Sequence, residues 1–433
     1  MPGLNPALRS SPLSGADAAG AAILAHAVDA FDRRLDPASP APIAIGFSGG
    51  GDSLALLLAA RAWAARTGRR LLALTVDHGL NPQSGRWTVE AGALAACLGV
   101  RFRALGWQGD KPLTGLPAAA RRARHALMAD AARAAGASVL LLGHTLDDVK
   151  EAVWMRARGS SVGAPRQWAP SPVWPEGRGV FLLRPLLGLG RAELRDLLAP
   201  SGLAWVEDPA NDDSRFLRAR ARQSVPTGAP RAEPTETVPP FQVDAGGAVL
   251  LPGQTGRRLL AMACVSAGGG ERLPRGRHLD ALLERLAAGE RFAATLAGAR
   301  IVAADDVRVI RDLGRSGGAS EPLPRGRAVV WDGRFEILAH RPGLVVRPLG
   351  GVMSRLEKAS RLRLRAFPSL VRPTLPAITD ADGNVTCPIL AQGAWSSART
   401  LVGDRLEAAC GRIAREPALA PGSHGEWGEG ALS

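Results

Sequence analysis

The feature that most constrains this chain is a glycine-rich turn set between two apolar segments. Residues 43–47 read Ile-Ala-Ile-Gly-Phe, Ser48-Gly49-Gly50-Gly51-Asp52-Ser53 follows directly, and residues 54–58 are Leu-Ala-Leu-Leu-Leu. This pattern predicts a short buried strand, a tight turn and then a helix. Consecutive glycines accept positive φ and let the backbone approach a ligand closely. The sequence therefore predicts a loop that can surround a bound group at a helix N-terminus.

That loop is suited to an anion, and to a phosphate above all. Backbone amides at a helix N-terminus point toward a bound anion, and the hydroxyls of Ser48 and Ser53 can add to them. No Lys follows the glycines, so the loop is not a Walker A motif. The alternative is an ordinary strand-to-helix turn without a ligand.

Charge and composition favour a polyanionic partner. The formal net charge of the 433 residues is +14, which points to nucleic acid before membrane. Coding bias toward Arg is the alternative, although such bias exchanges Lys for Arg without creating excess charge. The four cysteines form no CxxC pair, which argues against a zinc or iron–sulfur site. No apolar run is long enough to span a membrane and no signal peptide is recognisable, so we expect a cytoplasmic protein.

Apolar strands and amphipathic helices alternate over the first half of the chain. This alternation predicts an α/β fold with a doubly wound parallel sheet, followed by smaller α+β C-terminal domains. The expected strands are Ile43–Phe47, Leu71–Val76, Arg101–Leu105 and Val139–Leu142, and the expected helices are Ser53–Thr67, Ser84–Leu98, Pro117–Ala135 and Thr145–Arg158. Ligands of such sheets bind at the carboxyl ends of the strands, where the glycine loop, Asp77-His78 and His144 all fall.

Composition also suggests boundaries along the chain. We expect a flexible N-terminus at 1–20, a first domain at 21–222, a Pro-rich linker at 223–240, a small mixed α/β segment at 241–315, an Arg-rich C-terminal domain at 325–412 and a disordered tail at 413–433.

An acidic helix face is the second chemical signal. If Thr145 or Asp147 opens a helix, His144, Asp147, Asp148 and Glu151 fall at i, i+3, i+4 and i+7 and share one face. Three carboxylates this close repel one another unless a cation lies among them. Mg²⁺ on ATP phosphates and the ammonium groups of an amino acid are the two candidate cations. A solvated acidic first turn, stabilised by the helix dipole, is the alternative.

Basic residues supply the remaining signals. Arg121, Arg124 and His125 share a predicted helix face, and a basic, Gly-punctuated loop follows Arg158. An Arg-Pro-Leu run begins at Arg184, and an Arg-rich run spans 218–222. Arginines of this kind contact phosphate backbones, and an ordinary basic surface is the alternative.

Taken in order, these segments resemble the tRNA(Ile)-lysidine synthase family of N-type ATP pyrophosphatases. The shared motifs are Ser-Gly-Gly-x-Asp-Ser, Asp-His-Gly-Leu, Ala-Arg-x-x-Arg, His-x-x-Asp-Asp-x-x-Glu, Arg-Pro-Leu and Asp-Pro-x-Asn. The likeness is strong over residues 40–222 and looser over 325–400, and we expect the C-terminal domain at 325–412 to dock the tRNA. It implies a ligase that adenylates C2 of the wobble cytidine of the CAU-anticodon tRNA(Ile) and joins L-lysine there, releasing AMP and pyrophosphate. The lysidine formed changes the tRNA from Met to Ile specificity.

The resemblance also implies roles for individual residues. ATP would be bound by Ser48, Gly49, Gly50, Gly51, Asp52, Ser53, Asp77 and His78. Catalysis would involve Asp52, His144, Asp147, Asp148 and Glu151, with Mg²⁺ at Asp52 and Asp148. Lysine would be bound by Arg121, Asp147 and Glu151, and tRNA by Arg124, Arg158, Arg184, Arg218 and Arg222.

The chain departs from the family pattern at four positions: His125, Val149, Ala152 and Ala219. Two other functions remain as alternatives. A tRNA-thiolating enzyme of this fold would use active-site cysteines, and the chain has no CxxC pair. A non-catalytic RNA-binding relative would lack Asp52 or the acidic face, and both are present.

Overall fold

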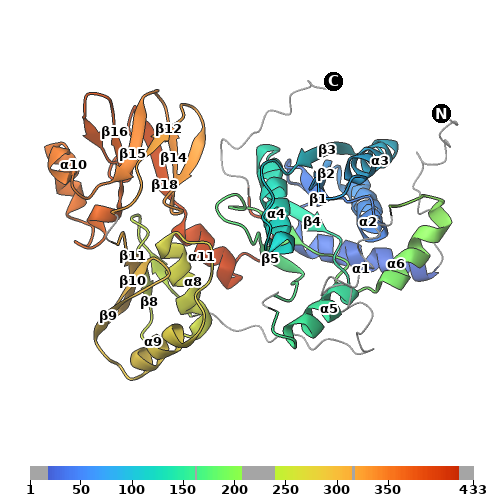
Figure 1. Ribbon diagram of the computed structural model, residues 1–433, viewed down its shortest axis with the longest axis horizontal. Coiled ribbons are helices and arrows are strands. Elements are labelled where there is room, and N and C mark those ends of the chain that lie inside the picture. Colours follow the sequence, from blue (N-terminus) through green and yellow to red (C-terminus); the bar gives the residue numbers. More distant parts are fainter. Residues whose placement is uncertain (1–17, 161–162, 207–238, 315–316, 419–433) are drawn as a thin grey trace. The chain divides into compact units, whose positions relative to one another are not determined.

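The computed structural model describes residues 18–160, 163–206, 239–314 and 317–418 (Figure 1). The chain divides into two compact units. Unit 1 comprises residues 1–234 together with 413–433, and unit 2 comprises 235–412. Unit 2 is therefore inserted, along the chain, between two segments of unit 1. None of the described helices is long and apolar enough to cross a membrane.

Unit 1 is built on a six-stranded, mostly parallel sheet in the order β3-β2-β1-β4-β6-β5. The strands are β1 (Ile43–Gly46), β2 (Leu71–Asp77), β3 (Arg101–Gly106), β4 (Val139–Leu142), β5 (Trp168–Pro170) and β6 (Phe181–Leu183). Only β5, at one edge, pairs antiparallel, with β6. Chain order reverses between β1 and β4, which is where an open α/β sheet forms its binding crevice.

Helices cover both faces of this sheet, as a doubly wound fold requires. They are α1 (Ala18–Arg34), α2 (Gly51–Thr67), α3 (Ser84–Cys97), α4 (Leu116–Ala134), α5 (Leu146–Arg156) and α6 (Arg191–Leu198). Ile43 and Ile45 of β1 pack with α1, α2, α3 and α6, whereas Ala44 packs with α4 on the opposite face. The alternation of side chains along one strand thus builds two cores.

Unit 2 consists of antiparallel sheets with four α-helices among its described residues. One sheet, β7-β8-β11-β10-β9, packs with the helices α8, α9 and α11. Its elements are β7 (Gln242–Val243), β8 (Val249–Leu251), α8 (Arg257–Gly268), α9 (Arg277–Ala287), β9 (Phe292–Leu296), β10 (Ala299–Ala303), β11 (Val307–Arg311) and α11 (Val402–Cys410).

Two further sheets, β12-β15-β16-β17 and β13-β14-β18, share a second core near α10. The elements are β12 (Glu321–Leu323), β13 (Ala328–Trp331), β14 (Phe335–Ala339), β15 (Leu344–Pro348), α10 (Lys358–Leu364), β16 (Pro376–Thr379), β17 (Val385–Thr386) and β18 (Ser396–Thr400).

The fold class agrees with the sequence prediction: a mostly parallel α/β domain is followed by smaller sheet-containing parts. The proposed subdivision of the C-terminal half needs a correction. Val402, Leu406 and Cys410 of α11 lie in the same core as α8, so 241–315 and 325–412 are not separate bodies. The proposed linker at 223–240 lies almost wholly outside the described residues. At the N-terminus, α1 already includes residues 18–20, which the sequence analysis placed in the flexible segment.

The C-terminal end of the described chain packs back onto unit 1, where the sequence predicted a disordered tail. We call Ile413–Glu416 the return segment. The Glu416 carboxylate forms a bidentate ion pair with Arg69, with N–O distances of 2.8 and 3.0 Å. Both side chains are almost completely buried, at 1% and 2% exposure. The Trp168 indole donates to the Ile413 carbonyl at 2.7 Å, so the first residues of the expected tail are part of unit 1.

Candidate active site

The glycine loop joins β1 to α2 and lies at the carboxyl edge of the sheet. Gly50 is the N-cap of α2, and Gly49 has φ +80°, a conformation that favours glycine. The hydroxyls of Ser48 and Ser53 lie 3.2 Å apart, and Ser53 donates to the Gly50 carbonyl at 2.8 Å. The predicted loop is therefore a compact turn held by its own serines.

Neighbouring backbone packs closely around this loop. The Val206 amide donates to the Gly49 carbonyl at 2.9 Å. A Cβ on Gly143, directly after β4, would lie 3.0 Å from the Asp52 carbonyl oxygen. Glycine at 143 thus lets the first turn of α2 approach the end of β4. This close approach brings the phosphate-loop candidate next to the acidic helix.

That acidic helix, α5, begins where the sequence predicted. Thr145 is its N-cap, and its amide donates to Asp148 Oδ2 at 2.8 Å. Asp148 and Glu151 are buried, with side chains 7% and 2% exposed. Asp147 points instead toward the start of α6, where its carboxylate accepts from the Arg191 amide at 2.8 Å.

Arg191, the first residue of α6, supplies the cation that the acidic face requires. Its Nε lies 3.2 Å from Asp52, its Nη2 lies 3.0 Å from Asp148, and its Nη1 lies 2.7 Å from Glu151. We call Asp52, Asp148 and Glu151 the acidic cluster. Burial alone would lower the pKa of Arg191, but Asp148 and Glu151 raise it above its usual value. Of the three carboxylates predicted to share a face, Asp148 and Glu151 therefore converge on one cation, together with Asp52 and without the side chain of Asp147.

A group of basic side chains lies beside the acidic cluster. The Arg184 Nε donates to His144 Nδ1 at 3.1 Å. Burial, followed by the charge of Arg184, lowers the pKa of His144 to about 3. Burial and then Arg121 lower the pKa of Arg184 to about 10. With this pKa, His144 is neutral near pH 7 and a weak base.

His125, which departs from the family pattern, is buried in the same region. Burial and then Arg124 lower its pKa to about 2. Both of its ring nitrogens are buried without a hydrogen-bond partner among the described residues. Arg121 and Arg124 are both close enough to influence His125 and His144 electrostatically, so the basic helix face predicted on α4 does meet the strand ends.

The Asp77-His78 pair ends β2 on the same rim. Asp77 accepts from the Gly79 amide at 2.8 Å, which is the strand-end turn that the sequence also allowed. The His78 ring meets Trp107 edge-on, with centroids 5.9 Å apart. Burial, then Arg124, lowers the pKa of His78 below its ordinary value.

The remaining arginines that the sequence analysis assigned to tRNA lie in different surroundings. Arg158 is exposed at the end of α5, and its guanidinium stacks on Trp154 at 3.6 Å. Arg184 is buried and donates to His144 inside the site, and its contact with tRNA stays a prediction. Arg218, Ala219 and Arg222 lie outside the described residues. Within the described part of the chain, no group of three His, Cys, Asp or Glu residues is arranged to hold a metal.

Sequence reasoning missed Arg191. It lies 40 residues beyond Glu151 and 139 beyond Asp52 along the chain. Its only local signal is its place at the start of an amphipathic segment after the Arg-Pro-Leu run. An argument from charge could have found it, because three converging carboxylates need a compensating cation.

Comparison with known proteins fits this geometry. The profile of the PP-loop domain family matches residues 24–228. The chain is 52% identical to the tRNA(Ile)-lysidine synthase of Caulobacter vibrioides over 400 residues, which cover 89% of this chain and 97% of that one. It is 37% identical to the tRNA(Ile)-lysidine synthase of Hyphomonas neptunium, over 74% of this chain and 92% of the relative. The chain therefore belongs to the tRNA(Ile)-lysidine synthase family.

Proposed function

We infer that this protein ligates lysine to C2 of the wobble cytidine of tRNA(Ile), using ATP. The C2 oxygen first attacks the α-phosphorus of ATP and releases pyrophosphate. The ε-amine of lysine then attacks C2, AMP leaves with the former C2 oxygen, and the nitrogen loses its protons. The observation that carries this inference is the acidic cluster beside the glycine loop, in a chain 52% identical to a lysidine synthase. A tRNA substrate also implies work in the cytoplasm.

We assign the ATP phosphates to the glycine loop. The loop residues Ser48–Ser53 present backbone and hydroxyl groups at the N-terminus of α2, which favours an anion. Mg²⁺ is usually held by phosphates and only one or two carboxylates. Asp52 and Asp148 fit that requirement, because their oxygens converge on the same guanidinium. Bound there, Mg²⁺ would neutralise charge that develops on the phosphates.

Lysine is assigned to Asp147 and Glu151. The carboxylates attract its ammonium group, and one of them takes up the proton that the nucleophile must lose. Arg121, exposed on α4, is the candidate for the lysine carboxylate or for a phosphate. Positioning and charge neutralisation then supply most of the rate enhancement.

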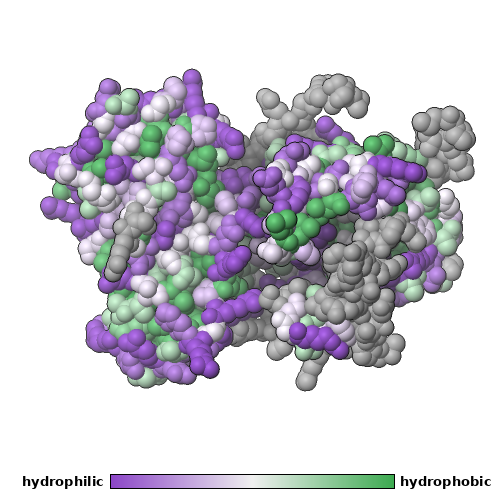
Figure 2. Space-filling view, in the orientation of Figure 1, coloured by the Kyte–Doolittle hydropathy of each residue, from purple (hydrophilic) through white to green (hydrophobic). Residues whose placement is uncertain are grey.

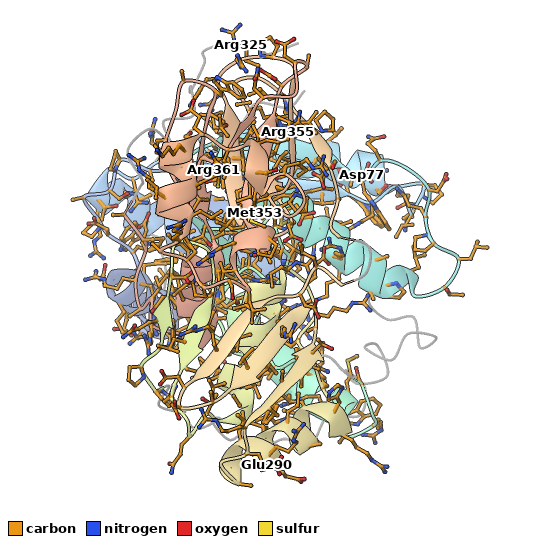
Figure 3. The ribbon with its side chains drawn as sticks, turned by 90° about the vertical axis from the view of Figure 1, so that its left-hand side faces the viewer. Asp77, Glu290, Arg325, Met353, Arg355 and Arg361 are labelled. Atoms are coloured by element: carbon orange, nitrogen blue, oxygen red, sulfur yellow. The ribbon has the colours of Figure 1, made fainter. Side chains whose placement is uncertain are left out.

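Unit 2 is proposed to dock the tRNA through a basic surface at α10. Arg361 lies on α10, Arg365 directly follows it and Arg355 precedes it by three residues; all three are exposed, and Figure 3 labels Arg355 and Arg361. Hydrophilic residues dominate the edge of unit 2 around α10 (Figure 2). Arg363 and Arg372 instead donate to the backbone carbonyls of Leu390 and Phe367, so they brace the fold.

The ligase activity is tested by nucleoside mass spectrometry. The protein is incubated with a CAU-anticodon tRNA(Ile), ATP and lysine, and the digested tRNA is searched for lysidine. AMP and pyrophosphate should form in step with the modified nucleoside. Formation of ADP, or of a thiolated nucleoside, would contradict the proposed reaction.

The docking surface is tested by salt dependence. Each neutralised phosphate contributes a slope of roughly 0.7–0.9 to the dependence of log affinity on log salt. Replacing Arg355, Arg361 and Arg365 by Gln should therefore reduce the slope by roughly 2–3. The matched control replaces Arg272, Arg275 and Arg277, which are also exposed on unit 2, and should leave the slope unchanged. Equal slopes for the α10 variant and the wild type would refute this assignment.

A further inference from the structure

Lys111 is held in a defined position by the loop that follows β3. It is one of three lysines in a chain whose Lys and Arg residues number 54. Its Nζ donates to the Trp107 carbonyl at 2.5 Å and to the Gly109 carbonyl at 3.1 Å, and it lies 4.1 Å from the centroid of the Trp107 ring. A compact ammonium can bond both carbonyls inside this turn, whereas the planar fork of an Arg has a different donor geometry. The loop therefore fixes a positive charge in place.

The backbone of Trp107 places this charge at the carboxyl edge of the sheet. The Trp107 amide donates to the Asp77 carbonyl at 2.9 Å, and the Trp107 ring meets His78 edge-on. In the strand order β3-β2-β1, neighbouring strands lie about 4.8 Å apart, so the ends of β3 and β1 are about 10 Å apart. Lys111 thus shares an edge of the sheet with the glycine loop that follows β1, but it belongs to a different part of that edge.

The charge of Lys111 is available to an anion. Within the part of the chain that the structure describes, its hydrogen-bond acceptors are the two neutral carbonyls, and no carboxylate forms an ion pair with it. An ammonium has three N–H donors, so one donor remains after these two bonds. The side chain is half-buried, so a ligand can reach it from solvent. Burial, Arg124 and Lys111 all lower the pKa of His78, which shows that the charge acts on this rim.

We propose that Lys111 binds a backbone phosphate of the tRNA next to the wobble nucleotide. The inference rests on the proposed tRNA substrate. The ATP phosphates are assigned to the glycine loop, whereas a tRNA that brings its wobble cytidine to this edge of the sheet also brings the flanking phosphates. A lysine binds phosphate as a point charge, and one that is already held in place loses little side-chain entropy on binding. Such a contact positions the RNA and carries no sequence information.

The test is the salt dependence of RNA binding by Lys111→Met. The ligand is an RNA hairpin with the anticodon stem and the CAU loop, and fluorescence anisotropy on the full-length protein measures its affinity. Loss of one phosphate contact should lower the slope of log affinity against log salt by roughly 0.7–0.9, so the weakening should grow by roughly five- to eightfold when the salt is diluted about tenfold. Lys111→Arg keeps the charge and should keep the slope. A loosened loop alone would weaken binding by the same factor at every salt concentration.

Arg66→Gln is the matched control. Arg66 is exposed in the last turn of α2, at the end of that helix opposite the glycine loop, so its loss removes one positive charge from unit 1 and should leave the slope unchanged. The affinity for ATP, measured by calorimetry, should be the same in Lys111→Met and in the wild type. An unchanged RNA slope in Lys111→Met would overturn the proposal, and a loss of ATP affinity in its place would assign the ammonium to an ATP phosphate. If the wild type failed to bind the hairpin, the proposed function itself would fail, and the role of Lys111 with it.

Discussion

We expect a substitution of Glu416 in the return segment to destabilise unit 1 strongly. In Glu416→Gln, the Arg69 guanidinium would lose its charged partner while its side chain remains 1% exposed. Breaking a buried ion pair by removing one partner costs about 3–5 kcal/mol. Arg69 keeps hydrogen bonds to the carbonyls of Ala41 and Asp36, so we expect the lower end, about 3 kcal/mol. With an m-value of about 3 kcal/mol/M, the urea midpoint of unit 1 should fall by about 1 M.

Hydrogen exchange read by mass spectrometry along a urea series can follow the two units separately. Peptides from β1 and β4 report unit 1, and peptides from β14 should stay unchanged as an internal reference. Glu90→Gln is the matched control, because Glu90 forms an exposed pair with Arg86 on α3, where such pairs contribute about 0–1 kcal/mol. If Glu416→Gln lowered the free energy of unfolding of unit 1 by less than about 1 kcal/mol, the reasoning would be refuted, because the buried Arg69 guanidinium would then have found another partner.

Three further predictions concern the active site. Asp52→Ala should lower the formation of AMP and pyrophosphate by roughly 10²–10³-fold, measured by chromatography of the products, and a smaller effect than tenfold would remove Asp52 from the reaction. Glu151→Gln should raise the KM for lysine more than the KM for ATP in a two-substrate titration, whereas equal changes would assign Glu151 to the fold. His125 is neutral when folded because its pKa is about 2, and it binds a proton on unfolding below its ordinary pKa. The free energy of unfolding of unit 1 should therefore fall by about 2 kcal/mol between pH 7 and pH 5 because of His125. A His125→Leu variant should not show this part of the decrease. Urea unfolding at a series of pH values measures it, and parallel pH curves for the variant and the wild type would contradict the prediction.

Much of unit 1 follows from local sequence pattern. The strand and helix predictions for residues 43–158 differ from the structure by two residues at most at nearly every boundary. Period-2 apolar strands and a glycine turn determine such elements locally, and the topology of alternating strands and helices then fixes where the strand ends meet. The acidic face was predictable for the same reason, because Thr145 caps the helix that carries it.

Long-range ion pairs could not be predicted in this way. Arg191 meets Glu151 only because α6 begins beside α5, and nothing in either segment alone encodes that contact. The same holds for α8, whose run of ten buried residues shares a core with α11 more than 100 residues later. Charge compensation within a buried cluster is a property of the assembled fold, so it needs the structure.

The return segment is synthesised after unit 2, so unit 1 is completed last. Arg69 is made 347 residues before its partner Glu416, and at about 5–20 residues per second the interval is roughly 17–70 s. Until then the nascent unit 1 holds an unmatched positive charge where the finished protein has a buried pair. A chain that stops anywhere within unit 2 therefore yields a weakened ATP-binding unit. Unit 1 can therefore be completed only after the whole of unit 2 has been translated.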